Sequence, residues 1–399
     1  MSGPAVLFTA FEPSGDEHAA PCIAELLRRR PGLRVYATGG ERMERAGATL
    51  LERTTERATM MLGSLGQVPT HLRRLKRLKA FLRETPVALH VPVDSPAANW
   101  SICDAVRGIR PEARIVHMVC PQVWAWASYR VHKLRRLTDH VMCLLPFEPA
   151  WLEKHGVRGT FVGHPVYSHA HEGHAEAAAG QGRASASPGA SLPGGAVRLA
   201  LLPGSRPKEI ERNGPTMVEA FRRLRADHPG LVGAVGAIHA QAAQRMGEFA
   251  RRAGLTEADL GALAMPVGRT PEVIEWCDLA LAVSGTITLH VALRRKPMVA
   301  MYNANWLLWH TLGARVVSTR TFTLPNLIAE WRWGRRVITE LTPHFGDPAP
   351  VERELRRLMD GPAEMERQRR ELGELAEVFV GHDWARETAD VVLGVLDRA

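Results

Sequence analysis

Residues 198–210 read Arg-Leu-Ala-Leu-Leu-Pro-Gly-Ser-Arg-Pro-Lys-Glu-Ile and decide the fold of the second half of the chain. The apolar run from Leu199 to Leu202 predicts a buried strand that ends in the turn Pro203–Arg206. From Ile210 to Leu224, apolar residues recur with the spacing of one helix face. A strand that leads through a glycine turn into a helix N-terminus is a typical anion site, because free N–H groups and the helix dipole favour a negative ligand.

The residues of this turn are suited to the diphosphate of a nucleotide. Gly204 allows a phosphate to approach the backbone, and Arg206 offers a planar fork of donors. An ordinary strand-to-helix turn with a surface arginine explains the same residues, so this pattern alone leaves both readings open. The donor-binding residues that we expect here are Gly204, Ser205, Arg206 and Glu209.

A second turn of the same kind follows at residues 278–286, which read Asp-Leu-Ala-Leu-Ala-Val-Ser-Gly-Thr. Ser284, Gly285 and Thr286 come between a predicted strand and a helix pattern over 287–293, and they offer two hydroxyl groups. A serine that only caps the helix is the alternative. Two such turns in one doubly wound domain fit a nucleotide site at the carboxyl ends of parallel strands.

Composition limits the class of protein. A chain of 399 residues is expected to form two or three domains. The net charge of +9 and the pI of about 9.7 suggest an acidic partner such as a phosphorylated substrate, anionic lipid or nucleic acid. The five cysteines are scattered and form no Cys-x-x-Cys pair, so we expect reduced thiols and neither a metal site nor disulfides. We see no signal peptide and no run long enough to span a membrane.

The order of the patterns predicts an α/β chain with two doubly wound domains. Strand and helix patterns alternate over residues 1–165, which predicts a parallel sheet with helices on both faces. Residues 166–196 are small, polar and low in complexity, which indicates a linker or insertion. A second α/β domain follows over 197–350, and the charged, helical residues 351–399 close the chain.

Two polar clusters in the first domain are candidates for binding an acceptor substrate. One cluster follows the strand at 5–10 and comprises Glu12, Ser14, Gly15 and Asp16, although Ser14 and Asp16 also suit a helix cap. The second begins with Asp94, which ends the strand at 87–93 and is placed to remove a proton from an acceptor hydroxyl. A helix N-cap is the alternative for Asp94. Asn99 is placed to bond a sugar or only to continue the loop.

Aromatic and basic stretches point to an amphiphilic ligand. Trp124 and Trp126 follow the next strand and are suited to stack on a sugar or an acyl chain, unless they are part of the core. Residues 71–83 combine a leucine stripe with arginines and lysines, which is typical either of a covering helix or of a helix on an anionic membrane surface. Nucleic acid is not expected, because no recognised binding motif accompanies these basic residues.

Together, these motifs resemble the lipid-A-disaccharide synthase family of glycosyltransferases. Each matching segment is short, but ten of them occur in the right order along nearly the whole chain. They are Glu12–Asp16, Gly39–Met43, Val93–Pro96 with Asn99, Pro121–Trp126, Leu145–Glu148, Phe161–Pro165, Leu202–Arg206, Ser284–Thr286, Pro297–Met298 and Leu324–Asn326.

The resemblance implies a GT-B fold, in which two Rossmann-like domains face a cleft and the last helices return to the N-terminal domain. It implies transfer from UDP-2,3-diacylglucosamine to 2,3-diacylglucosamine 1-phosphate (lipid X) with inversion, without a metal or other cofactor. Asp94 would act as the base, and Asn326 and His290 would join the UDP site. The enzyme would be cytoplasmic and peripherally bound to the inner face of the membrane through residues 71–83 and the tryptophan-rich stretch 306–333.

Two positions depart from the family pattern. The family has a second aspartate where this chain has Ala97, and usually a glutamate where it has His290. An imidazole lacks the paired acceptor oxygens of a carboxylate. The alternatives are therefore a related GT-B transferase with another nucleotide-sugar donor or acceptor, or an inactive relative that binds nucleotide or lipid. Oligomeric state is left open by the sequence.

Overall fold

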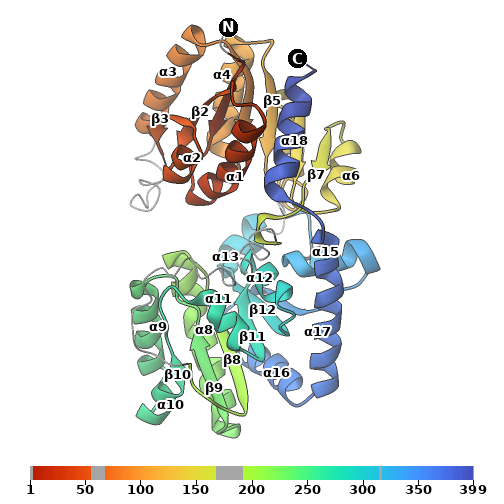
Figure 1. The fold of residues 1–399 in the computed structure, drawn as a ribbon. Coiled ribbons are helices and arrows are strands. Elements are labelled where there is room, and N and C mark those ends of the chain that lie inside the picture. The colour runs from red at the N-terminus through yellow and green to blue at the C-terminus, as the bar shows by residue number, and fades with distance from the viewer. Residues whose placement is uncertain (1–2, 55–67, 168–191, 314–316, 399) are drawn as a thin grey trace. The chain divides into compact units, whose positions relative to one another are not determined.

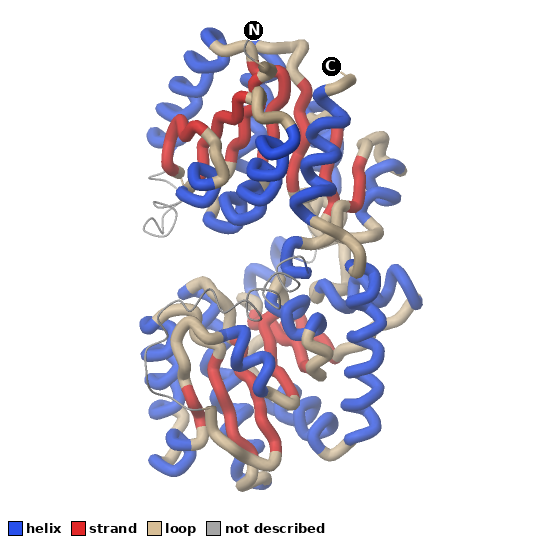
Figure 2. Tube along the Cα trace, viewed as in Figure 1, coloured by secondary structure: helices blue, strands red, loops and turns tan. Residues whose placement is uncertain are grey.

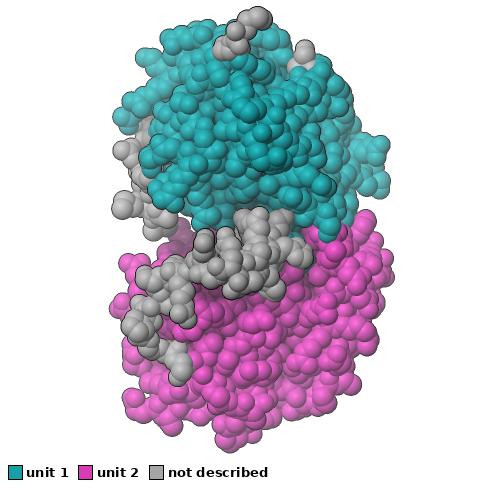
Figure 3. All heavy atoms as spheres, in the orientation of Figure 1, with its two compact units in different colours: residues 1–169, 381–399 teal, residues 170–380 magenta. Residues whose placement is uncertain are grey.

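The computed structural model describes residues 3–54, 68–167, 192–313 and 317–398. The chain divides into two compact units, coloured separately in Figure 3. Unit 1 comprises residues 1–169 and 381–399, and unit 2 comprises residues 170–380. In each unit, strands lie between layers of helices (Figures 1 and 2).

Unit 1 contains a seven-stranded parallel sheet with the strand order β3-β2-β1-β4-β5-β6-β7. The order reverses between β1 and β4, which are hydrogen-bonded neighbours with Thr9 opposite Pro92. The carboxyl ends of these two strands therefore form the switch point where doubly wound sheets bind ligands. The strands are β1 (Ala5–Thr9), β2 (Arg34–Gly39), β3 (Thr49–Arg53), β4 (Val87–Pro92), β5 (Arg114–Met118), β6 (His140–Cys143) and β7 (Gly159–Phe161).

The helices of unit 1 cover both faces of this sheet because successive strand residues point to opposite sides. Val6 and Phe8 of β1 belong to the core cluster that contains α1 and α18, whereas Leu7 belongs to the cluster under α3 and α4. The helices are α1 (Pro13–Arg29), α2 (Glu41–Arg45), α3 (Val68–Glu84), α4 (Pro96–Ile109), the 3₁₀ turn η2 (Ser128–Arg130), α5 (Val131–Leu137), α6 (Glu148–Glu153) and α18 (Trp384–Leu396).

Unit 2 contains a six-stranded parallel sheet with the order β10-β9-β8-β11-β12-β13, which reverses between β8 and β11. Its strands are β8 (Val197–Leu202), β9 (Leu231–Val235), β10 (Leu263–Ala264), β11 (Leu279–Val283), β12 (Met298–Asn303) and β13 (Thr339–His344). Its helices are α8 (Pro207–Asp227), α9 (Ala240–Arg252), α10 (Glu257–Gly261), α11 (Thr270–Trp276), α12 (Ile287–Leu293), α13 (Trp306–Leu308), the π-helical turn η3 (Trp309–Gly313), α15 (Leu324–Trp333), α16 (Pro348–Met359), α17 (Pro362–Ala376) and the 3₁₀ turn η4 (Glu377–Phe379).

The C-terminal helices divide between the two units, and only the last of them returns to the N-terminal unit. α16 and α17 belong to unit 2, since Val351, Leu355 and Leu358 are buried in its core. α18 alone joins unit 1, where it lies beside α1 (Figure 1). The Trp384 indole is buried in the core cluster of unit 1 and donates to the carbonyl oxygen of His18 at 2.9 Å.

Apolar patterns predict eleven of the thirteen strands of the described residues, at 5–10, 33–38, 87–93, 113–119, 139–145, 159–162, 197–202, 231–235, 262–265, 278–283 and 297–301. The two strands without such a pattern, β3 and β13, lie at sheet edges. β3 is exposed or partly exposed at every residue, so it lacks a buried apolar run. β13 is partly exposed along most of its length and contains Pro343, which the pattern of a central strand excludes. An edge strand needs less burial, and its sequence signal is weaker for that reason.

Candidate functional site

Asp94 lies at the switch point of unit 1, in a turn with an unusual backbone. Asp94 and Ser95 have φ angles of 46° and 39°, a left-handed conformation that is uncommon for residues other than glycine. The N–H of Asp94 donates to the carbonyl oxygen of Met118 at 2.9 Å. Because such strain tends to gather at functional sites, the geometry of the turn supports a role for this carboxylate.

Asn99, the first predicted partner of this turn, is buried and holds its backbone. The Asn99 amide donates to the carbonyl oxygens of Val93 at 3.2 Å and Asp94 at 2.9 Å. Its own oxygen accepts from the Thr9 hydroxyl at 2.7 Å. Every polar atom of the amide group is thus engaged with the protein, so the structure places Asn99 as a support for Asp94 rather than beside a ligand.

His90 extends this network beneath the turn, and sequence reasoning missed both His90 and Thr9. His90 Nε2 lies 2.8 Å from the Thr9 hydroxyl. Since that hydroxyl gives its one proton to Asn99, His90 donates here through Nε2. Burial lowers the pKa of His90 to about 3, so the ring is neutral. A polar residue inside the apolar run 87–93 was the signal available in the sequence.

The predicted cluster after β1 separates into exposed and structural residues. Glu12 is exposed and Ser14 is partly buried at the start of α1. Gly15 is buried, and a Cβ there would lie 3.0 Å from Ala10 Cβ, so the helix start fits closely against the switch point. The buried Asp16 carboxylate accepts N–H bonds from Gly40, Arg42 and Met43 at 2.8–3.1 Å. Asp16 therefore caps α2.

The two predicted tryptophans have different surroundings. Trp124 is 9% exposed and donates from its indole N–H to Glu148 at 3.0 Å. Trp126 is 48% exposed, and the Arg130 guanidinium lies 4.5 Å from its ring centre. The same guanidinium lies 4.6 Å from the ring of Trp100. Trp124 is a core residue, and Trp126 is the one whose face reaches solvent.

The predicted phosphate turn lies between β8 and α8, at the switch point of unit 2. Gly204 has a φ of 108°, which favours glycine. The Glu209 carboxylate accepts N–H bonds from Ser205 at 3.1 Å and Arg206 at 3.3 Å, and it pairs with the Arg206 side chain at 3.3 Å. A carboxylate thus occupies the N–H groups that the sequence assigns to a phosphate, while the Arg206 side chain is 73% exposed.

The second turn lies beside the first because β8 and β11 are neighbouring strands, with Ala282 opposite Leu202. The Ser284 hydroxyl donates to the carbonyl oxygen of Phe322 at 2.8 Å. Thr286 immediately precedes α12, and His290 is partly buried within that helix. Ser284 therefore links the turn to the segment that leads into α15.

Asn326 is buried and orders the same segment. Its amide donates to Ile338 O and Glu340 Oε2, both at 3.1 Å, and accepts from the N–H groups of Val337 and Ile338. Glu340, which sequence reasoning missed, also accepts from the Thr323 hydroxyl at 2.7 Å. These bonds fix the loop beside Ser284. Glu340 was missed because it belongs to the unpredicted edge strand β13.

Among the described residues, Cys120, Cys143 and Glu148 place three potential metal-ligand atoms within 4.8 Å of one another. All three residues are buried. The Glu148 carboxylate already accepts N–H bonds from Trp124, Leu144 and Leu145 at 2.9–3.0 Å. Burial nevertheless raises the pKa of Glu148 to about 7. The group is satisfied by the protein, and it forms part of the core around Trp124.

Solved structures with the same arrangement of strands and helices define the fold class. A UDP-GlcNAc 2-epimerase from Neisseria meningitidis, bound to UDP-GlcNAc, has a TM-score of 0.60 at 12% identity, covering 98% of this chain and 99% of that one. The glycotransferase of kitacinnamycin has a TM-score of 0.57 at 17% identity, covering 98% and 99%. The chain has the GT-B fold of nucleotide-sugar glycosyltransferases, with two Rossmann-like domains, which confirms the predicted fold class.

Proteins of similar sequence identify the family within this fold class. The model of the lipid-A-disaccharide synthetase family matches residues 6–370. A lipid-A-disaccharide synthase of Anaeromyxobacter dehalogenans (strain 2CP-1 / ATCC BAA-258) is 32% identical, covering 98% of this chain and 97% of its own. Another, from Burkholderia mallei (strain SAVP1), is 34% identical, covering 98% and 96%. The chain belongs to the lipid-A-disaccharide synthase family of hexosyltransferases, as its motifs predict.

Proposed function

We propose that this protein transfers a diacylglucosaminyl group from UDP-2,3-diacylglucosamine to the 6-hydroxyl group of 2,3-diacylglucosamine 1-phosphate. The products are the β-1′,6-linked lipid A disaccharide 1-phosphate and UDP. The family match over residues 6–370 supports this reaction. The observation that carries the mechanism is the strained turn, which holds Asp94 at the carboxyl end of β4.

Asp94 acts as the general base in this mechanism. Its carboxylate removes the proton of the acceptor hydroxyl as the oxygen attacks the anomeric carbon of the donor. The bond from that carbon to the UDP oxygen breaks on the opposite face, so the configuration inverts. Glu12, Ser14 and Trp126 border the acceptor, whereas Asp16 and Asn99 act through the backbone that they hold.

The donor site lies at the switch point of unit 2 in this proposal. Arg206 and the N–H groups of Ser205 and Arg206 stabilise the charge on the leaving diphosphate once Glu209 releases them. Gly204 gives the diphosphate room to approach. The nucleotide is bound by the second turn, with Ser284, Gly285, Thr286 and His290 at its surface and Asn326 as the support of the adjoining loop.

A turnover assay tests this proposal. The purified protein is mixed with both substrates in detergent, and disaccharide and UDP are followed by mass spectrometry. We expect product from the wild type and at least a 1,000-fold loss of turnover, about 4 kcal/mol, in Asp94→Ala. UDP affinity should stay within about twofold, because Asp94 does not contact UDP in this mechanism.

Each other outcome has a definite meaning. If Asp94→Ala turns over normally, Asp94 is not the base. If the wild type binds UDP and forms no disaccharide, the donor or the acceptor differs from the one proposed. The variant Glu12→Gln serves as a matched control, since it alters an exposed carboxylate of the same site that has no proton-transfer role here.

We also propose that the protein associates peripherally with the anionic cytoplasmic face of a membrane, where its lipid substrates lie. Among the described residues, no helix is long and apolar enough to cross a bilayer. α3 carries the basic face that supports the proposal. In unit 2, Trp306, Leu307 and Trp331 are each more than half exposed, which supports a contribution from that stretch.

A further inference from the structure

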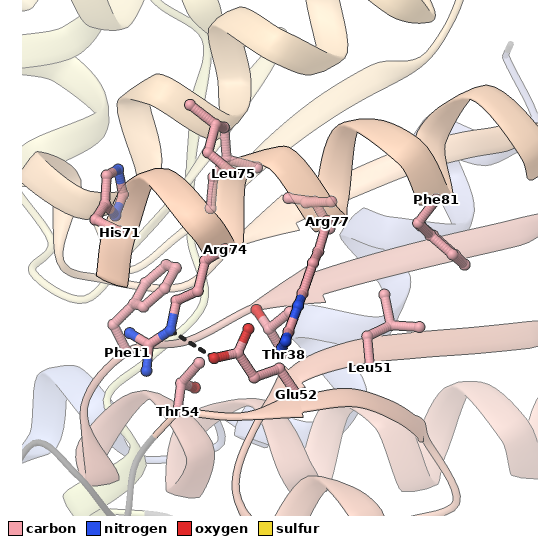
Figure 4. Close-up of a pocket in the computed structure, with 12 residues that line it drawn as sticks. Phe11, Thr38, Leu51, Glu52, Thr54, His71, Arg74, Leu75, Arg77 and Phe81 are labelled. Carbon is pink, nitrogen blue, oxygen red and sulfur yellow. Dashed lines mark hydrogen bonds and ion pairs between the residues drawn. The ribbon is translucent and has the colours of Figure 1, made fainter. Parts of the chain in front are cut away.

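A cavity of about 170 Å³ lies in unit 1 between α3 on one side and β2, β3 and the loop after β1 on the other. Figure 4 shows α3 on one side, contributing Leu75 and Phe81, and the strand side with Phe11 and Leu51 opposite. Leu78 and Ile102 complete the apolar wall. The cavity is a gap in the hydrophobic layer under α3 and α4, and apolar contacts with an extended chain would fill it.

One polar group in this wall has no partner among the described residues. The Thr38 hydroxyl is buried, with the residue 8% exposed, and it forms no hydrogen bond with any part of the chain that the structure describes. Leaving a buried hydroxyl unpaired is costly, so the site favours a ligand that offers it an acceptor atom. By contrast, the Thr54 hydroxyl in the same wall is satisfied, since it donates to the carbonyl oxygen of Ala10 at 2.6 Å.

Positive charge lies at the same place. Figure 4 shows Arg77 reaching from α3 toward Thr38 and Glu52. Arg74 pairs with Glu52 at 2.8 Å, while Arg77 forms no ion pair or hydrogen bond with the described residues. The cavity therefore combines an apolar wall with a hydroxyl group and a guanidinium group that have no partner among the described residues. These features suit a ligand in which an acyl chain is joined through its carbonyl group to an anionic molecule.

We propose that this cavity binds an acyl chain of the acceptor substrate, with the Thr38 hydroxyl donating to the acyl carbonyl oxygen and Arg77 attracting the acceptor phosphate. This inference rests on the proposed function and adds a subsite to it. The acceptor rather than the donor is chosen because Phe11 of the cavity wall adjoins Glu12 and both follow β1. β1 is also the neighbour of β4, and the turn after β4 contains Asp94.

Filling the cavity should change the preference for chain length. In Leu75→Trp the larger ring occupies the cavity, so long acyl chains no longer fit. Over a series of acceptors with progressively longer chains, we expect kcat/KM to fall about fourfold for each methylene group that is excluded, while the shortest acceptor is used normally. Ala80→Trp is the matched control, because Ala80 lies on the exposed side of the same helix and outside the cavity.

Removing the unpaired hydroxyl should affect binding without affecting folding. Thr38→Val keeps the side-chain shape and removes a hydroxyl that forms no hydrogen bond with the described residues. We expect the thermal midpoint to be unchanged or higher and the acceptor KM to rise roughly fivefold to tenfold, with kcat and the donor KM unchanged. This pattern separates a ligand contact from a structural role, since a structural role would lower the thermal midpoint.

The outcomes distinguish the subsite from the reaction. An active wild type whose chain-length profile is shared by Leu75→Trp and Ala80→Trp would overturn the subsite alone. A profile that shifts with the chains of the donor, and not with those of the acceptor, would assign the cavity to the donor and overturn the proposal as stated. A wild type that uses no acceptor in the series would overturn the proposed function, and the subsite with it.

Discussion

The backbone of Asp94 and Ser95 is stable only because neighbouring side chains hold it. Two consecutive left-handed residues without a glycine cost on the order of 1–3 kcal/mol each. Asn99 compensates by bonding the carbonyl oxygens of Val93 and Asp94. The backbone from which the Asp94 side chain extends is therefore held by an amide five residues later in the chain.

Replacing Asn99 tests this dependence. Asn99→Ala leaves two carbonyl oxygens and the Thr9 hydroxyl without their partner, so we expect a loss of about 2–3 kcal/mol in the free energy of unfolding. We also expect kcat to fall at least tenfold with little change in either KM, because the base is displaced and the substrates still bind. Urea unfolding and steady-state kinetics measure the two effects. The control Thr9→Val keeps both bonds from the Asn99 amide to carbonyl oxygens, so its kcat should fall much less. An equal fall in kcat in the two variants would contradict the role assigned to Asn99.

The role proposed for Arg206 is in binding the donor and not in stabilising the fold. Its side chain is largely exposed and, among the described residues, pairs with Glu209, so Arg206→Ala should change the free energy of unfolding by less than about 0.5 kcal/mol. UDP affinity, measured by calorimetry, should fall roughly 10- to 100-fold through the loss of charge-assisted bonds to the diphosphate. Arg206→Lys keeps the positive charge but loses the planar set of N–H donors, so its UDP affinity should lie between those of the wild type and Arg206→Ala. Unchanged UDP affinity in Arg206→Ala would move the diphosphate site elsewhere.

At the scale of elements, β4 carries a buried histidine that makes unit 1 sensitive to acid. Burial lowers the pKa of His90 to about 3, against about 6.5 in the unfolded chain. The folded protein excludes a proton that the unfolded chain accepts below pH 6.5. The contribution of His90 to the free energy of unfolding is therefore fully present above pH 6.5 and is lost as the pH falls toward 3.

A neutral replacement isolates this effect. Between pH 7.5 and pH 4.5, the wild type should lose on the order of 3 kcal/mol more unfolding free energy than His90→Gln, which has no proton to gain. Urea unfolding at the two pH values gives the difference directly. Burial also lowers the pKa of His117 to about 4, and the charge of His117 helps to lower the pKa of His90, so the same comparison is made with His117→Gln in both backgrounds. Equal acid sensitivity of the two proteins would show that His90 does not titrate in this way.

The same elements show what the sequence could predict. Central strands such as β1 and β11 are continuous apolar runs, so the apolar pattern located the strands and the turns after them, in which the candidate site residues lie. The edge strands β3 and β13 escaped because partial exposure removes the apolar signal. Asn99, Asp16 and Asn326 were identified as important, yet their supporting roles depend on hydrogen bonds across distant segments, which spacing along the chain does not reveal.

At the scale of the whole molecule, composition determines the net charge, whereas packing determines which unit each C-terminal helix joins. The charge of +9 is a property of composition and supports an anionic partner directly. The division of the C-terminal helices depends on which core accepts which apolar face. Helices α16 and α18 each carry an apolar face, but Leu355 is buried in unit 2 and Val392 in unit 1. The unit that a helix joins is determined by packing and cannot be derived from helical periodicity.

The basic face of α3 should bind anionic membranes in a salt-dependent manner. Reversing two exposed charges of this helix in the double variant Lys76→Glu/Arg83→Glu should weaken binding to anionic vesicles by about 2 kcal/mol or more, roughly thirtyfold. The control Lys154→Glu/Arg370→Glu makes the same change in net charge at the residue after α6 and on α17, and it should bind nearly as the wild type. Vesicle sedimentation at low and high salt measures both, and binding should weaken for all as salt screens the charges. If the two double variants lose the same vesicle affinity, the net charge of the protein and not α3 attracts the membrane. If salt does not change the vesicle affinity, the contact is not electrostatic.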